Sequence, residues 1–87
     1  MIKLRCSRVW FYSPADESGF FYFIKQIKAV QFVEGLGEDV FLHIKTPITL
    51  RSLRDLIGLF RRYNIDLADL KRLKNKKTAK IFEQVPM

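Results

Sequence analysis

The spacing of hydrophobic and polar residues along the 87-residue chain predicts first a strand over residues 3–12. The pattern is strongest over residues 8–12, where β-branched and aromatic side chains follow one another. A period of two puts Val9 and Phe11 on one face of this strand. Trp10 and Tyr12 fall on the other face. Because both faces are apolar, we expect an interior strand covered on each side, or one whose second face meets a partner.

A helix is predicted to follow. Ser13 suits the N-cap, Pro14 suits the first helical position, and Asp16 stands where a capping-box acid would be. At roughly 100° per residue, residues 15–30 collect an apolar stripe on one side of this helix. The stripe consists of Phe20, Phe23, Ile24, Ile27 and Val30, with Phe21 at its edge. We expect it to pack on the sheet, with Tyr22 on the outer face.

Residues 30–34 and 39–45 are predicted to form two strands of a hairpin, joined by a glycine-containing loop at residues 35–38. Alternation along the second strand separates two sets of side chains. Val40, Leu42 and Ile44 point one way, and Phe41, His43 and Lys45 point the other. The hairpin therefore has one clearly apolar face.

The clearest amphipathic helix is predicted to begin at Leu50, after the possible caps Thr46 and Thr49. Its apolar half consists of Leu50, Leu53, Leu56, Ile57, Leu59, Phe60 and Tyr63. Asn64 suits a left-handed position after the helix, and the run 66–69 can cap a short helix. Leu67, Leu70 and Leu73 would face inward from that short helix. Periodicity over residues 79–85 is compatible with a helix or a strand.

The predicted order of elements is βαββα, typical of an α+β sandwich with a three- to four-stranded sheet and two or three helices. A strand at residues 79–85 would turn this into the ferredoxin-like order βαββαβ. We expect a single domain over residues 1–87. It divides into a strand-helix-hairpin part (1–45), a helical part (46–74) and a basic C-terminal segment (75–87).

Charge is distributed unevenly along the chain, whose net charge is +7. Residues 1–44 carry five basic and five acidic side chains, whereas residues 45–87 carry eleven basic and four acidic ones. Six of those basic residues lie between Lys71 and Lys80. Such a surface fits an anionic partner or simply keeps the protein hydrated. One cysteine, no signal-peptide pattern and no apolar run of membrane length lead us to expect a cytoplasmic protein.

Residues with catalytic or metal-binding chemistry do not form a recognisable motif. His43 has no serine or cysteine partner identifiable from the sequence, and Cys6 lacks the second cysteine of a redox or zinc motif. No patterned oxygen ligands surround Glu38 and Asp39, and the glycines at 35 and 37 lack the rest of a phosphate loop. We therefore expect no enzyme, no catalytic residue, no metal and no cofactor.

Basic side chains on the polar arc of the second helix, and those that follow it, are the candidate contacts to a partner or to phosphate. They are Arg51, Arg54, Arg61, Arg62, Lys71, Arg72, Lys74, Lys76 and Lys77. Gly58 leaves an opening between the helix arginines through which a phosphate backbone or a partner's chain could approach. The alternative is an ordinary hydrated helix face.

Candidate contacts to a protein lie in the neutral half of the chain and are Tyr22, Glu34, Glu38 and Asp39. The aromatic side chains of Trp10, Tyr12 or Phe41 could stack on bases if their sheet face were open, although covering of that face is the more common arrangement.

Two segments, residues 8–17 with the phenylalanine-rich helix after them and residues 53–66, resemble small bacterial proteins encoded beside polymorphic or contact-dependent toxins. Those proteins are presumed to be immunity proteins. The resemblance implies a stoichiometric binder that occludes a toxin's active site and needs no catalytic residues. Our first hypothesis is therefore a protein-binding module, with toxin neutralisation its most specific form. The alternative is a nucleic-acid-binding protein that uses the arginine face and the lysine-rich segment.

Overall fold

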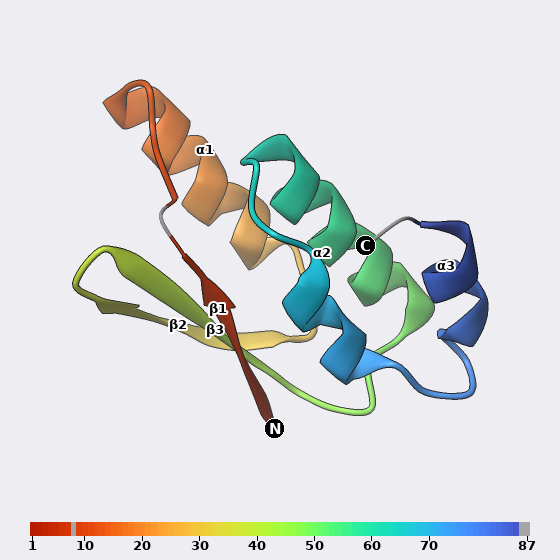
Figure 1. Cartoon of the computed structure of the whole chain (residues 1–87). Helices are drawn as coiled ribbons and strands as arrows, with labels where there is room; N and C mark the ends of the chain where they lie inside the picture. Colours follow the sequence, from red (N-terminus) through yellow and green to blue (C-terminus); the bar gives the residue numbers. More distant parts are fainter. Residues whose placement is uncertain (8, 86–87) are drawn as a thin grey trace.

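The computed structural model describes residues 1–7 and 9–85. The elements, in chain order, are β1 (Ile2–Cys6), α1 (Pro14–Lys25), β2 (Val30–Leu36), β3 (Asp39–Ile44), α2 (Leu50–Arg62), the 3₁₀ helix η1 (Ala68–Leu73) and α3 (Ala79–Gln84). Figure 1 shows the helices gathered on one side of the sheet, with the other side left open. The chain is therefore a two-layer α+β fold.

The sheet has three antiparallel strands in the order β1-β3-β2. β1 and β2 consequently run parallel to each other, with β3 between them and α1 as the crossover. The predicted α+β class with a βαββα order is confirmed. Residues 79–84 form a helix, so the fourth strand of a ferredoxin-like order is absent from the described residues. That version of the prediction was wrong.

The first strand is shorter than predicted and lies at the edge of the sheet. β1 ends at Cys6, whose partner is Val40, close to the start of β3. Beyond this pair β3 turns back into β2, so a longer β1 would have no strand to bond with. Ser7 lies in a turn, residues 9–12 are irregular, and Arg8 lies outside the described residues. The expectation of an interior strand covered on both faces was therefore wrong.

α1 begins as the sequence predicts and ends earlier. The hydroxyl of Ser13 accepts a hydrogen bond from the amide of Asp16 at 3.1 Å, and Pro14 occupies the first turn. The Asp16 carboxylate accepts from the amide of Tyr12 at 3.0 Å, which ties the incoming chain to the helix start. The helix ends at Lys25, so Ile27 of the predicted stripe lies in the turn that follows, and Val30 is the first residue of β2.

The hairpin is confirmed, with a tighter turn than predicted. Leu36 pairs with Asp39, so only Gly37 and Glu38 form the turn. Gly37 has φ = 62°, a conformation that glycine adopts without steric cost. A bulge at Gln31 interrupts the regular register between β2 and β3.

The alternation predicted for β3 is also confirmed. Leu42 and Ile44 are fully buried under the helices, whereas Phe41 and His43 lie on the face that the helices leave open.

α2 supplies more buried hydrophobic residues to the core than any other element. The side chain of Thr49 caps its first turn by accepting from the amide of Ser52 at 3.2 Å, and Asn64 has φ = 57° after its end, both as predicted. Its buried residues are Ser52, Leu53, Leu56, Ile57, Leu59 and Phe60. They pack against Leu4, Cys6, Leu42 and Ile44 of the sheet, Phe20 and Ile24 of α1, and Leu70, Leu73 and Ile81 of the C-terminal helices. α2 is therefore the element on which the other layers converge.

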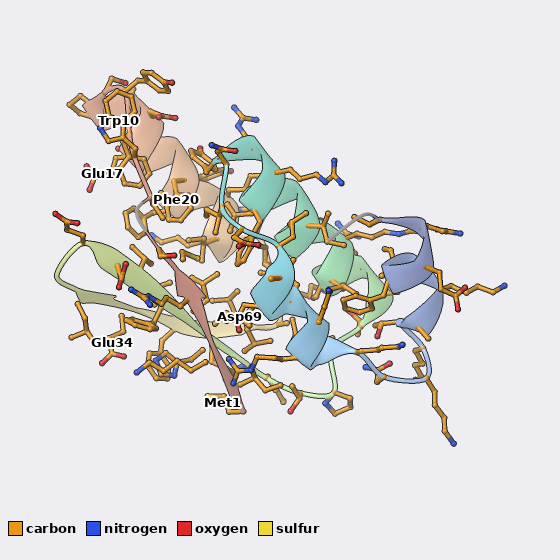
Figure 2. All side chains as sticks on the ribbon, viewed as in Figure 1. Met1, Trp10, Glu17, Phe20, Glu34 and Asp69 are labelled. Carbon is orange, nitrogen blue, oxygen red and sulfur yellow. The ribbon has the colours of Figure 1, made fainter. Side chains whose placement is uncertain are left out.

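The segment after α2 protects the free edge of β1. η1 lies beside this strand, and Figure 2 places Asp69 over it. The Asp69 carboxylate accepts a hydrogen bond from the amide of Arg5 at 3.2 Å. The Arg72 guanidinium donates to the carbonyl of Lys3 at 2.8 Å, and it also pairs with Asp69 at 3.4 Å. These two side chains satisfy backbone groups that a further strand would otherwise bond to.

Removing the guanidinium of Arg72 tests this edge contact. We expect Arg72→Met to lower the free energy of unfolding by about 1 kcal/mol, because a charged hydrogen bond to the backbone is lost at a partly exposed site. Urea denaturation measures the change. The matched control is Lys71→Met, which removes a cation from the same short helix without breaking a side-chain hydrogen bond or ion pair among the described residues. Equal losses in the two variants would contradict the assignment.

Two glycines should respond in opposite directions to alanine. A Cβ on Gly58 would lie 3.7 Å from Cζ of Phe23, an ordinary contact, so Gly58→Ala should stabilise the protein by about 0.5–1 kcal/mol through helix propensity. Gly37→Ala should destabilise it by about 1–2 kcal/mol, because Gly37 has a positive φ. Chemical denaturation of both variants checks the signs. A stabilised Gly37→Ala variant would be inconsistent with this turn.

Candidate functional site

The predicted basic contacts are spread along the whole of α2 and do not form one patch. Arg51 lies in its first turn, Arg54 near its middle, and Arg61 and Arg62 in its last turn. All four are exposed. A helix of 13 residues is about 20 Å long, so its two ends are separate sites.

A cation-lined hollow lies at the first turn of α2, and we call it the α2 N-terminal hollow. Its volume is about 230 Å³. It is lined by Gln26, Lys28, Ala29, Lys45, Pro47, Ile48, Thr49, Arg51, Ser52 and Asp55. Sequence reasoning selected only Arg51 in this set, because Lys28 and Lys45 are single lysines far apart in the chain. Only the packing of two turns against α2 brings them together.

The lysine-rich segment reaches the same end of α2. The Asn75 side chain donates to the carbonyl of Ile48 at 3.3 Å and accepts from the amide of Lys77 at 2.8 Å. This anchoring puts Lys76 and Lys77 on a second, more open hollow that shares its Pro47–Thr49 wall with the first. The predicted residues Arg51, Lys76 and Lys77 therefore lie on one side of the molecule.

The remaining predicted cations have different surroundings. Arg72 is engaged with the edge of β1, as described above, whereas the side chains of Lys71 and Lys74 are exposed. The opening expected at Gly58 is bordered by the ring of Phe23 from α1. A helix–helix contact thus occupies one side of the gap that we had expected to admit a phosphate backbone.

Trp10 and Tyr12 form an exposed aromatic pair at the C-terminal end of α2. Trp10 is 65% exposed and Tyr12 is 84% exposed, and their rings meet edge to face with centroids 4.3 Å apart. They line a hollow of about 290 Å³ together with Asp16, Arg62, Tyr63 and Asn64. We call these six residues the Trp10 surface. Figure 2 shows Trp10 at the tip of the molecule, while Phe20 points into the core.

The backbone under the Trp10 surface is held in place from both sides. Phe11, between the two exposed rings, packs on Phe20 at 5.3 Å and on Tyr63 at 6.3 Å between ring centroids. The amide of Tyr12 is bonded to the Asp16 carboxylate. The exposed rings are therefore presented by an ordered segment, although that segment is not a strand.

The open face of the sheet carries a network of paired charges and rings. The Glu34 carboxylate lies 3.2 Å from Nε2 of His43 and 3.5 Å from the ammonium of Lys3. The His43 ring stacks on Phe32, with centroids 3.9 Å apart and planes 16° apart. Lys3 also lies 4.5 Å from the centroid of Phe41. Phe41 thus lies on an open sheet face, as base stacking would require, but Lys3 already covers its ring.

The acidic residues predicted as protein contacts are distributed over this face and its turn. Asp39 forms an ion pair with Arg5 at 2.6 Å, Glu34 belongs to the network above, and Glu38 is exposed at the turn. Tyr22 lies elsewhere, on the outer side of α1, and is 67% exposed. These four residues consequently do not make a single surface.

The pKa values of Glu34 and Cys6 are shifted from their ordinary values. The hydrogen bond to His43 is the main cause of the lowered pKa of Glu34. Desolvation opposes this shift, and the nearby Lys3 ammonium lowers the pKa further. Burial raises the pKa of the Cys6 thiol to about 12, and the charge of Asp69 adds to this effect. Cys6 therefore remains a protonated core side chain at neutral pH.

The described residues contain no group of three or more His, Cys, Asp or Glu side chains arranged to hold a metal ion. In the same part of the chain, no helix has the length and apolar character needed to cross a membrane. No protein-family model, curated protein or solved structure matches the chain.

The Glu34–His43 contact should make the stability of the fold depend on pH. Because the pKa of Glu34 is lowered on folding, its ionised form stabilises the fold above the unfolded-state pKa, and this stabilisation disappears as pH falls through the folded-state value. In an NMR titration of the side chain, His43→Leu should move the Glu34 midpoint upward, whereas His43→Gln, which keeps a donor, should move it less. An unchanged midpoint in His43→Leu would refute the contact.

Proposed function

We propose that the chain is a small, non-enzymatic, cytoplasmic protein-binding module that docks its partner through the Trp10 surface. The observation that carries this proposal is the Trp10–Tyr12 pair, two large rings that stand in solvent beside Arg62. Tryptophan, tyrosine and arginine are the side chains that most often dominate the energy of protein interfaces. Here they come from an irregular segment and the end of α2, and the partly buried Phe11 holds the segment through its ring contacts with Phe20 and Tyr63.

The energetics of such a site favour a protein over a small polar ligand. Each exposed ring loses a large apolar area from water on docking, and its backbone is already ordered, so little conformational entropy is lost. Arg62 lines the hollow next to these rings, and Arg61 is exposed in the same helical turn. The fitting partner therefore has an apolar contact for Trp10 and an adjacent acidic group for the arginines.

Toxin neutralisation is the most specific form of this proposal. It is supported by the resemblance of two segments of this chain to presumed immunity proteins. Residues 8–17 include both rings of the Trp10 surface, and residues 53–66 include Arg62 and Asn64. A stoichiometric inhibitor needs a stable scaffold and a complementary surface, and the compact core supplies the scaffold. The net charge of +7 makes an acidic toxin face the complementary one.

The direct test is binding of the purified chain to the product of the neighbouring gene, measured by isothermal titration calorimetry. We expect one-to-one binding that Trp10→Ala weakens by about 30-fold or more, because a central aromatic anchor contributes about 2 kcal/mol or more. The matched control is Leu36→Ala, which removes another exposed apolar side chain, 51% accessible, from the hairpin. No binding by the unmodified chain, or equal weakening by both variants, would reject the proposal.

A further inference from the structure

Three positive side chains converge on the α2 N-terminal hollow from three separate segments. Lys28 comes from the turn before β2, Lys45 from the end of β3 and Arg51 from the first turn of α2. Among the described residues none of them forms an ion pair, whereas Lys3, Arg5 and Arg72 are paired with carboxylates elsewhere. Asp55 is the one acid in the lining, so the hollow carries an excess of two positive charges.

The start of α2 adds a second attraction for anions. The 13 aligned peptide units of this helix place partial positive charge at its first turn. Thr49 uses its hydroxyl to accept from the amide of Ser52, and its carbonyl accepts from the amide of Leu53. The amides of Leu50 and Arg51 make no such contact among the described residues, and both residues are exposed. They can donate to an oxyanion.

Ser52 adds a neutral donor to the hollow. It is only 5% exposed and lines the hollow, yet its hydroxyl forms no hydrogen bond to any described residue. Every fully enclosed side-chain oxygen or nitrogen in the described part of the chain has a partner. The Ser52 hydroxyl is therefore accessible to solvent, and we infer that this access is through the hollow. A nearly buried hydroxyl facing a cationic hollow is an unused donor.

We propose that the α2 N-terminal hollow binds a phosphate group, held by Lys28, Lys45 and Arg51 with the Ser52 hydroxyl and the first amides of α2 as neutral donors. The volume of about 230 Å³ admits a phosphate with its ester substituent. The excess of two positive charges matches the charge of a phosphate monoester at neutral pH and exceeds the single negative charge of a diester. This site lies at the opposite end of α2 from the Trp10 surface, so it is independent of the protein-binding function proposed above.

The phosphate can be free, part of a nucleotide or part of a nucleic-acid strand. Lys76 and Lys77, across the Pro47–Thr49 wall, give further cations within reach of a ligand that extends from the hollow. A strand of nucleic acid would use them together with the hollow, and its affinity would fall steeply with salt concentration. A free phosphate or a mononucleotide would use the hollow alone.

The test is a titration of the ¹⁵N-labelled chain, followed by two-dimensional NMR, with three probes: inorganic phosphate, a nucleoside monophosphate and a short single-stranded oligonucleotide. We expect saturable shifts at the amides of Leu50, Arg51 and Ser52. The double variant Lys28→Gln/Lys45→Gln should weaken binding by about tenfold or more, because charged hydrogen bonds are lost. Ser52→Ala should weaken it less.

The matched control is Arg61→Gln/Lys80→Gln, which removes the same charge from exposed positions outside the hollow. Binding of the smallest probe should be unchanged in this control, and the probe with the highest affinity identifies the source of the phosphate. Shifts spread evenly over all basic segments, equal weakening in the two double variants, or no saturable shift with any probe would overturn the proposal.

Discussion

The burial of one apolar sheet face under α2 is the constraint on which the rest of the structure depends. A sheet this small has one apolar face, and helices must cover that face to keep it out of water. Leu53, Leu56 and Leu59 are fully buried, and each contributes roughly 2 kcal/mol through the area removed from solvent. α1 lies on one side of α2, and η1 and α3 lie on the other (Figure 1). The positions of these helices therefore depend on packing against the buried residues of α2.

How far the sequence predicts the structure depends on whether a feature is local. The caps at Ser13 and Thr49, the alternation in β3 and the left-handed Asn64 follow from neighbouring residues, and the structure confirms all of them. The length of β1 does not follow from neighbouring residues, because a strand extends only as far as its partner strand. Likewise, Tyr12 is a good strand former that lies in solvent because β3 has already turned away.

The candidate surfaces show the same division. Arg51 and Arg62 are recognisable from the polar arc of one helix, but the residues that give each its chemistry come from elsewhere in the chain. Lys28 and Lys45 join Arg51 only through the packing of two turns, and Trp10 joins Arg62 only because β1 ends early. A helical wheel therefore identifies the cations and leaves their neighbours unknown. The two groups lie at opposite ends of α2 and are therefore separate surfaces.

The contacts of Asp69 and Arg72 with β1 make the two edges of the sheet different. One outer edge is closed by side chains that take the place of a strand, while β2, at the other edge, has no neighbour among residues 1–7 and 9–85. Any strand from another molecule that joined this sheet would have to enter beside β2. The bulge at Gln31 limits such an extension to the stretch between Phe32 and Leu36. The β1 edge is thus protected against the addition of a further strand.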